Sequence, residues 1–212
     1  MDLAEAVSIA HTLSEPSKMP WYGYSIPAST CKIGAKFAKV KGTTCNICYA
    51  LKGRYVFPNV QEAMHKRFRS LPHPQWVEAM TVQLTHYSKR YKFGTPAFRW
   101  HDSGDLQGLW HLNNIVEVAE NTPHIIHWLP TREVPTVRAF LEQRQFPPNL
   151  SVKISSSLIG KQGSRPVEGL GVTTVGRDED SSLFQCDAYD RGGKCGPCRT
   201  CWTNKDVNRR AH

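Results

Sequence analysis

The sequence predicts an α/β protein with a mainly parallel sheet and a cysteine-rich C-terminal extension. Between about residues 97 and 155, short apolar runs alternate with helical patterns in the order strand, helix, strand, helix, strand, which is typical of a parallel sheet. The chain has 212 residues, enough for one ordinary domain with a hydrophobic core. After about residue 160 it becomes rich in Gly, Ser, Thr and Asp, and it then reaches four closely spaced cysteines.

Each expected element follows from a local pattern. Residues 3–14 repeat apolar side chains at helical spacing, and Pro16 ends that pattern. A stretch rich in loops is expected to about residue 55. Pro135 suits the first turn of a helix, where its missing N–H group is tolerated. We predict further helices over residues 59–69, 74–90, 106–120 and 134–143, and strands over residues 97–101, 124–129 and 150–155.

We interpret these elements as one domain with an appended tail. The core covers residues 1–165 and includes a cluster loop over residues 30–55, which carries three cysteines. The extension covers residues 166–212 and is expected to pack on the core. The sequence therefore predicts one partial-barrel-like α/β core, not two large domains.

The charge balance favours acidic partners such as nucleic acid. Lys and Arg number 27 against 18 Asp and Glu, a formal net charge of +9. Local concentrations occur only in residues 32–41, 66–69 and 205–210, and we interpret these as solvated faces. At most weak nucleic-acid binding is therefore expected. The beginning of the chain has no long apolar stretch, so we expect no membrane contact and a cytoplasmic location.

Seven cysteines carry the strongest chemical signal of the sequence. Stable disulfides are rare in a reducing cytoplasm, and the number of cysteines is odd. Tight C-x2-C spacings under those conditions are better explained by metal ligation. The predicted metal ligands are Cys31, Cys45, Cys48, Cys186, Cys195, Cys198 and Cys201.

The first group consists of Cys31, Cys45 and Cys48, with thirteen residues in the first gap and two in the second. Three thiolates leave one iron of a 4Fe-4S cubane without a protein ligand, which an enzyme needs if a small molecule is to bind the cluster. The C-x2-C pair is also the commonest half of a zinc site. A structural zinc half-site therefore stays open for this group.

The second group has gaps of eight, two and two residues between Cys186, Cys195, Cys198 and Cys201. Its last three cysteines resemble the C-x2-C-x2-C run of bacterial ferredoxins more than a zinc ribbon, so the spacing favours a 4Fe-4S cluster. The group would supply all four ligands of its own cluster or lend one cysteine to the first group. The sequence thus predicts one or two clusters.

Polar side chains follow three of the predicted strands, in residues 101–105, 131–133 and 155–157. Ligands of parallel α/β sheets bind beyond the C-terminal ends of the strands. Asp105 could accept hydrogen bonds from a ligand ammonium or ribose, and Arg132 could hold a carboxylate or phosphate. The alternative is ordinary capping of the helices that follow.

Four stretches of the chain resemble the phage gene-product-88 family. They are residues 45–55 (CNICYALKGRY), 99–105 (RWHDSGD), 128–133 (WLPTRE) and 195–202 (CGPCRTCW). The resemblance covers nearly the whole chain from about Thr30. It implies a phage-encoded protein in the host cell cytoplasm, and it indicates a class of protein without specifying a reaction.

More distantly, the pattern resembles the radical S-adenosylmethionine (SAM) superfamily. That resemblance implies a partial (β/α) barrel with a three-cysteine cluster loop near its start. Cys45 and Cys48 match the last two positions of the superfamily's C-x3-C-x2-C loop, whereas Cys31 lies thirteen residues before Cys45 instead of three. The implied cofactors are a 4Fe-4S cluster and SAM.

The resemblance to that superfamily also implies roles for the strand ends. Ser103, Gly104 and Asp105 fall where its Gly-Gly-Glu motif holds the methionine amino group. Asp105 and Arg132 would then orient SAM or the substrate and serve as the catalytic residues.

Three hypotheses follow for the function. The first is a radical-SAM-like enzyme in which the N-terminal cluster passes one electron to the SAM sulfonium and the C-terminal cysteines hold an auxiliary cluster. The second is a non-enzymatic 4Fe-4S protein that serves electron transfer, sensing or structure. The third is a zinc-stabilised nucleic-acid-binding module. The substrate or redox partner is not identified by the sequence.

Overall fold

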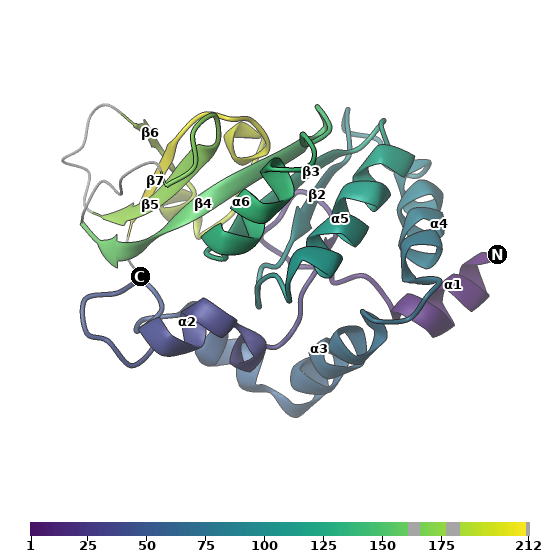
Figure 1. Cartoon of the computed structure of the whole chain (residues 1–212), viewed down its shortest axis with the longest axis horizontal. Helices are drawn as coiled ribbons and strands as arrows, with labels where there is room; N and C mark the ends of the chain where they lie inside the picture. The colour runs from purple at the N-terminus through teal and green to yellow at the C-terminus, as the bar shows by residue number, and fades with distance from the viewer. Residues whose placement is uncertain (161–165, 177–182, 211–212) are drawn as a thin grey trace.

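The computed structural model describes residues 1–160, 166–176 and 183–210, and these residues form one parallel sheet with helices around it (Figure 1). The seven strands of the described residues pair in parallel in the order β1-β2-β3-β4-β5-β7-β6. This confirms the predicted α/β fold class with a parallel sheet. The strands are β1 (Gly23–Tyr24), β2 (Ala97–Trp100), β3 (Ile126–Thr131), β4 (Leu150–Ile159), β5 (Gly171–Gly176), β6 (Phe184–Gln185) and β7 (Val207–Arg210).

The first five strands lie side by side in the order in which they occur along the chain. Each crossover therefore returns to the neighbouring position, as in a (β/α) barrel. Their C-terminal ends share one edge of the sheet. The helices are α1 (Leu3–Ala10), α2 (Lys32–Phe37), α3 (Pro58–Ser70), α4 (Trp76–Ser88), α5 (Leu109–Asn121) and α6 (Val134–Leu141).

One face of the sheet, the helix face, carries the main hydrophobic core. Side chains alternate along a strand, so Phe98 and Trp100 of β2 point to this face together with Leu129 of β3. Helices α4, α5 and α6 cover it, as Figure 1 shows in teal and green. The core side chains here are almost fully buried.

The opposite face, the cysteine face, carries a smaller core and is covered by the C-terminal segment. Ala97 and Trp128 of the sheet pack there against Cys201 and Trp202. The Trp202 Nε1 donates a hydrogen bond of 2.7 Å to the backbone carbonyl of Phe98. The short 3₁₀ helix over Thr200–Trp202 thus closes this face over β3 and β4.

The C-terminal extension is built into the sheet. Residues after 165, expected as a tail on the core, contribute β5, β6 and β7 to the same sheet, and residues 161–165, 177–182 and 211–212 lie outside the described part. The sequence GVTTVG of β5 is buried at five of its six positions, so it lacks the alternation that marks a half-buried strand.

Other differences from the prediction concern short elements. The stretch to residue 55, expected as loops, contains β1 and α2, which are too short for a periodic pattern to appear. Strand β4 continues to Ile159, so residues 155–157 lie inside the strand and not beyond its end. The run 205–210, interpreted as a solvated face, includes β7, whose Val207 and Asn208 are buried.

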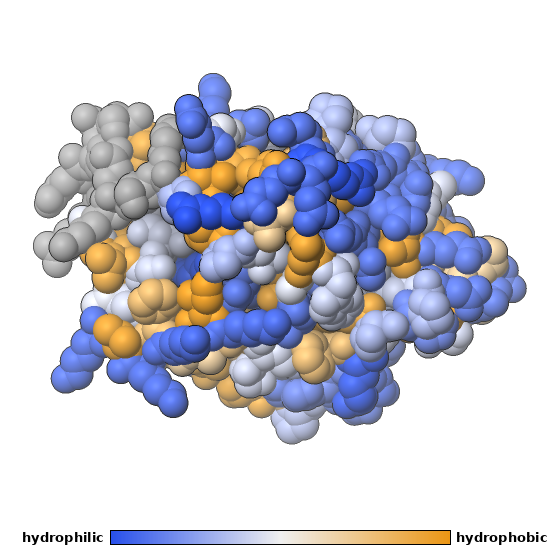
Figure 2. Space-filling view, in the orientation of Figure 1, coloured by the Kyte–Doolittle hydropathy of each residue, from blue (hydrophilic) through white to orange (hydrophobic). Residues whose placement is uncertain are grey.

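The surface is mixed in polarity. Figure 2 shows hydrophilic side chains over most of one face, with apolar groups scattered between them. Among the described residues, no helix combines the length and the apolar character that a membrane span requires.

Candidate functional site

The first three cysteines surround the start of α2. Cys31 is the residue before the helix, and Cys48 directly precedes a 3₁₀ helix over Tyr49–Leu51. A Cβ atom on Gly34 would lie 3.6 Å from the Sγ of Cys45 and 3.7 Å from the Sγ of Cys31. Both sulfurs therefore face the same point of the helix, where a side chain larger than glycine would also meet the Cβ of Cys31 at 3.0 Å.

Burial dominates the electrostatics of these thiols. It raises the pKa of Cys31 to about 12, with further increases from the negative charges of Asp105, Cys48 and Cys45, while Arg132 opposes the shift. Burial also raises the pKa of Cys45, and Arg132 again opposes it. Coulomb interactions weaken with distance, so these five groups lie near one another. The structure thus brings the first cysteine group to the predicted residues Asp105 and Arg132.

Asp105 joins the ends of two strands. Its Oδ1 accepts hydrogen bonds from the Thr131 hydroxyl at 2.5 Å and the Leu106 backbone N–H at 2.8 Å, and its Oδ2 accepts one from the Arg132 backbone N–H at 2.9 Å. Burial raises the pKa of Asp105 to about 6, although these hydrogen bonds favour the charged form. Both carboxylate oxygens are therefore engaged within the chain.

The Arg132 side chain connects the cysteine loop to the edge of the sheet. Its Nη2 donates to the Thr44 hydroxyl at 2.6 Å and to the Ser156 carbonyl at 3.3 Å, and Thr44 also donates to Ser156. The buried Nε of Arg132 has no hydrogen-bond partner among the described residues. A donor on a positively charged group thus stays unpaired close to Cys31 and Cys45.

Ser103 and Gly104, predicted to bind a cofactor, form the tight turn after β2. Gly104 has φ +88°, and a Cβ atom there would lie 2.2 Å from a side-chain carbon of Ile26. The Ser103 backbone carbonyl accepts a hydrogen bond from the Ile26 N–H at 3.1 Å. The Ser103 hydroxyl is buried and has no partner among the described residues. The backbone of this pair therefore packs against the segment after β1.

The second cysteine group lies on the cysteine face of the sheet. Burial raises the pKa of Cys195, the charges of Cys201 and Cys186 raise it further, and Arg209 and Arg99 oppose the shift. Burial lowers the pKa of Lys153 to about 8, and the negative charges of Cys201 and Cys198 oppose that shift. The four cysteines thus lie in one region with cationic side chains from the sheet. Among the described residues, no three Cys, His, Asp or Glu side chains are placed to hold a single metal ion.

Sequence reasoning missed these cationic side chains. Arg99 of β2, Lys153 of β4 and Arg209 of β7 all come from strands and point to the cysteine face. The available signal was a charged residue flanked by apolar residues within a predicted buried strand, as at Phe98-Arg99-Trp100. Such a residue is rarely buried without a partner.

A tyrosine connects the two cysteine groups. Tyr49, which follows Cys48, accepts a hydrogen bond of 3.1 Å from the Nη2 of Arg99 and donates to the Asp102 carbonyl. Tyr55 donates to the Asp102 carboxylate at 2.7 Å. The N-terminal loop is therefore linked to Arg99, which also acts on Cys195 of the second group.

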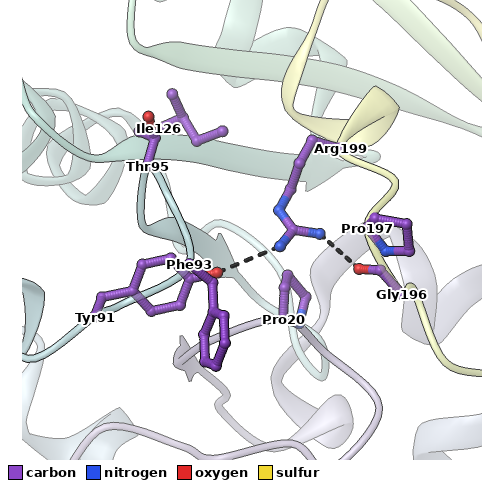
Figure 3. Close-up of a pocket in the computed structure, with 8 residues that line it drawn as sticks. All are labelled: Pro20, Tyr91, Phe93, Thr95, Ile126, Gly196, Pro197 and Arg199. Carbon is purple, nitrogen blue, oxygen red and sulfur yellow. Dashed lines mark hydrogen bonds between the residues drawn. The ribbon is translucent and has the colours of Figure 1, made fainter.

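A pocket of about 600 Å³ opens beside the second cysteine group (Figure 3). Arg199 crosses it, donating to the Gly196 carbonyl at 2.8 Å and the Tyr91 hydroxyl at 3.3 Å. The pocket brings solvent to the loop between Cys195 and Cys201, near the start of β3. Its lining residues are Pro20, Tyr91, Phe93, Thr95, Ile126, Gly196, Pro197 and Arg199.

The fold and the two cysteine groups define an α/β protein with one thiol group near the C-terminal edge of a parallel sheet and another on its cysteine face. The family model Gene product 88 matches residues 3–204. The chain therefore belongs to the phage gene-product-88 family, as its motifs predicted. Searches of curated proteins and of solved structures found no match.

Proposed function

We propose that this protein is an iron–sulfur protein that holds a 4Fe-4S cluster at each cysteine group. The main support for the proposal is that each thiol group lies near buried guanidinium N–H donors. These donors have no hydrogen-bond partner among the described residues. These donors are the Nε atoms of Arg132 at the first group and of Arg99 and Arg209 at the second. A buried cationic donor is costly unless an anion accepts from it, and a thiolate-ligated cluster is such an anion.

The spacing of the thiols favours a cluster over zinc. A zinc ribbon usually separates two C-x2-C pairs by a longer loop, whereas the second group has three cysteines at successive three-residue steps. The ferredoxin-like spacing of Cys195, Cys198 and Cys201 points the same way.

The chain's own residues prepare the thiols for ligation. Burial keeps Cys31 and Cys45 protonated in the metal-free protein, because it raises their pKa. Arg132 opposes that shift at both cysteines and so favours the thiolate form that a metal requires. Glu133 accepts a hydrogen bond of 2.9 Å from the Ile33 N–H and holds the start of α2 against the end of β3.

Radical-SAM-like chemistry is a second candidate for the first group. The thiols that act most strongly on Cys31 are Cys48 and Cys45, and those that act on Cys195 are Cys201 and Cys186. This separation favours two independent sites, the first with three thiolates. Such a cluster would supply an open iron and one electron to SAM, and Arg132 is the nearby side chain that could orient the ligand's carboxylate.

The test is anaerobic purification with iron, sulfide and zinc counted per chain. We expect two clusters' worth of iron and sulfide, and Cys45→Ala should lose the iron of the first site alone because two thiolates anchor a cluster poorly. Asn46→Ala is the matched control, because Asn46 is the next residue of the same loop and its side chain donates to the Ala38 carbonyl instead of offering a thiolate. Stoichiometric zinc without sulfide, or unchanged iron in Cys45→Ala, would contradict the proposal.

The same preparations separate the two candidates. Added SAM should change the electron paramagnetic resonance spectrum of the reduced N-terminal cluster if one iron is open. An unchanged spectrum together with full iron content would leave a non-enzymatic iron–sulfur protein.

A further inference from the structure

Three cations line the cysteine face of the sheet beside the second cysteine group. The Cζ atoms of Arg99 and Arg209 lie 4.5 Å and 4.7 Å from the centre of the Trp128 ring. The Nη2 of Arg209 lies 3.2 Å from the Sγ of Cys201, within hydrogen-bonding distance. The Lys153 ammonium donates to the backbone carbonyls of Thr200 and Lys205, which flank that cysteine.

Strand register explains why residues so distant in sequence meet. Arg99 pairs with Trp128 across β2 and β3, so both side chains point to the cysteine face. Side chains at alternate positions of a strand share a face, which brings Lys153 of β4 to the same side. Arg209 of β7 lies opposite Val175 of β5, and its contact with Trp128 places it there too.

The three cations make no close ion pair with a carboxylate in the described part of the chain. The buried Nε atoms of Arg99 and Arg209 also have no partner in that part of the chain. Buried charges are normally paired, because an unpaired one is strongly destabilising. The thiols of Cys198 and Cys201 act on Lys153 together with Asp206, and Asp102, Tyr49 and Tyr55 act on Arg99. The contact of Arg209 with a thiol is direct, to the Cys201 sulfur.

We propose that Arg99, Lys153 and Arg209 form a cationic wall that neutralises an anionic four-thiolate cluster at Cys186, Cys195, Cys198 and Cys201, with Arg209 donating directly to the Cys201 sulfur. This inference rests on the proposed iron–sulfur function and adds the residues that set the redox properties of the second site. Four thiolates outweigh the positive charge of a 4Fe-4S core, and reduction adds a further electron. Cations and hydrogen bonds to sulfur therefore stabilise the reduced state more and raise the reduction potential.

The test compares Arg209→Gln with Arg210→Gln in the full chain, purified anaerobically. Arg210 is the next residue of β7 and pairs with Asp190 at 2.8 Å near the surface, so it is a matched control. Iron and sulfide are counted, and the midpoint potential of the C-terminal cluster is measured by a titration followed by electron paramagnetic resonance. We expect Arg209→Gln to lower the equilibrium constant for reduction about tenfold, or about 59 mV for one electron. Arg209→Lys should shift the midpoint potential less, and Arg210→Gln should have the midpoint potential of the wild type.

The outcomes distinguish this inference from the proposed function. A wild-type chain without iron and sulfide would refute the iron–sulfur function itself. Full iron content with the same midpoint potential in Arg209→Gln and the wild type would refute only the cationic wall. If Arg209→Gln does not fold, Lys153→Gln applies the same test, because it removes a charge of the wall that makes no bond to a sulfur in the structure. An unchanged potential in Lys153→Gln would then overturn the inference.

Discussion

Gly104 shows how one residue sets the turn at the C-terminal end of β2. Its φ of +88° is a left-handed conformation that side chains disfavour, and Ile26 occupies the space where a Cβ atom would stand. The same turn presents Asp105 to the backbone N–H groups of Leu106 and Arg132. A glycine here is therefore required by both backbone and packing.

Gly104→Ala should lower the free energy of unfolding by about 3 kcal/mol, because strain in φ adds to a steric clash with Ile26. Gly94→Ala is the matched control: Gly94 has φ +85°, and a Cβ atom added there would meet nothing within 4 Å, so only the strain of about 1 kcal/mol remains. Urea denaturation of both variants measures the difference. Equal losses would show that Ile26 moves aside at little cost.

At the scale of elements, the C-terminal segment is held on the sheet by few but well-placed contacts. Trp202 packs against Trp128 with ring centres 5.3 Å apart, and its indole N–H bonds the Phe98 carbonyl of β2. Ser151 of β4 donates to the Thr203 carbonyl at 2.8 Å. These contacts position the loop that carries Cys195, Cys198 and Cys201.

Trp202→Phe should destabilise the protein by about 2 kcal/mol, since it removes the bond to the Phe98 carbonyl and leaves a small void. Hydrogen exchange should rise first in β7, which follows this segment. Trp110→Phe serves as the control, because Trp110 is 44% exposed and lies in α5 away from the cysteine face. Both effects are read from urea denaturation and exchange rates. Similar losses for the two variants would contradict the role of Trp202 in holding the segment.

At the scale of the whole molecule, buried titratable groups make stability depend on pH. Burial lowers the pKa of His101 and His127 to about 3 and that of His111 well below its usual 6.5. Below pH 6.5 the unfolded chain binds protons at these residues and the folded chain does not, so stability falls with falling pH. Asp105 acts in the opposite direction between pH 6 and 4, because burial raises its pKa to about 6.

We therefore expect a net loss of stability on acidification. The opposite effect of Asp105 cancels that of one histidine and leaves the effect of two. The free energy of unfolding should therefore fall by at most about 3 kcal/mol per pH unit between pH 6 and 4. Urea midpoints at pH 7, 6 and 5 measure it. His127→Phe keeps a ring against Trp100 and should flatten the pH dependence of the urea midpoint. A midpoint that does not move between pH 7 and 5 would contradict this.

The middle of the fold was predictable because its signals are local. Strands β2, β3 and β4 and helices α3 to α6 lie close to their predicted positions, since each has a periodic apolar pattern of sufficient length. Strands β1, β6 and β7 span two to four residues, and β5 is buried on both faces, so no periodicity could reveal them. Their pairing depends on partners far away in the sequence.

The sequence by itself determined the α/β class, the family and the division of seven cysteines into two groups, because these depend on spacing along the chain. Only the tertiary structure decided what surrounds each group. Asp105, expected to face a ligand, has both oxygens engaged by the neighbouring strand end. Arg99 and Arg209 meet at Trp128 although 110 positions separate them, since strand register and the closing of the C-terminal segment, not sequence spacing, bring them together.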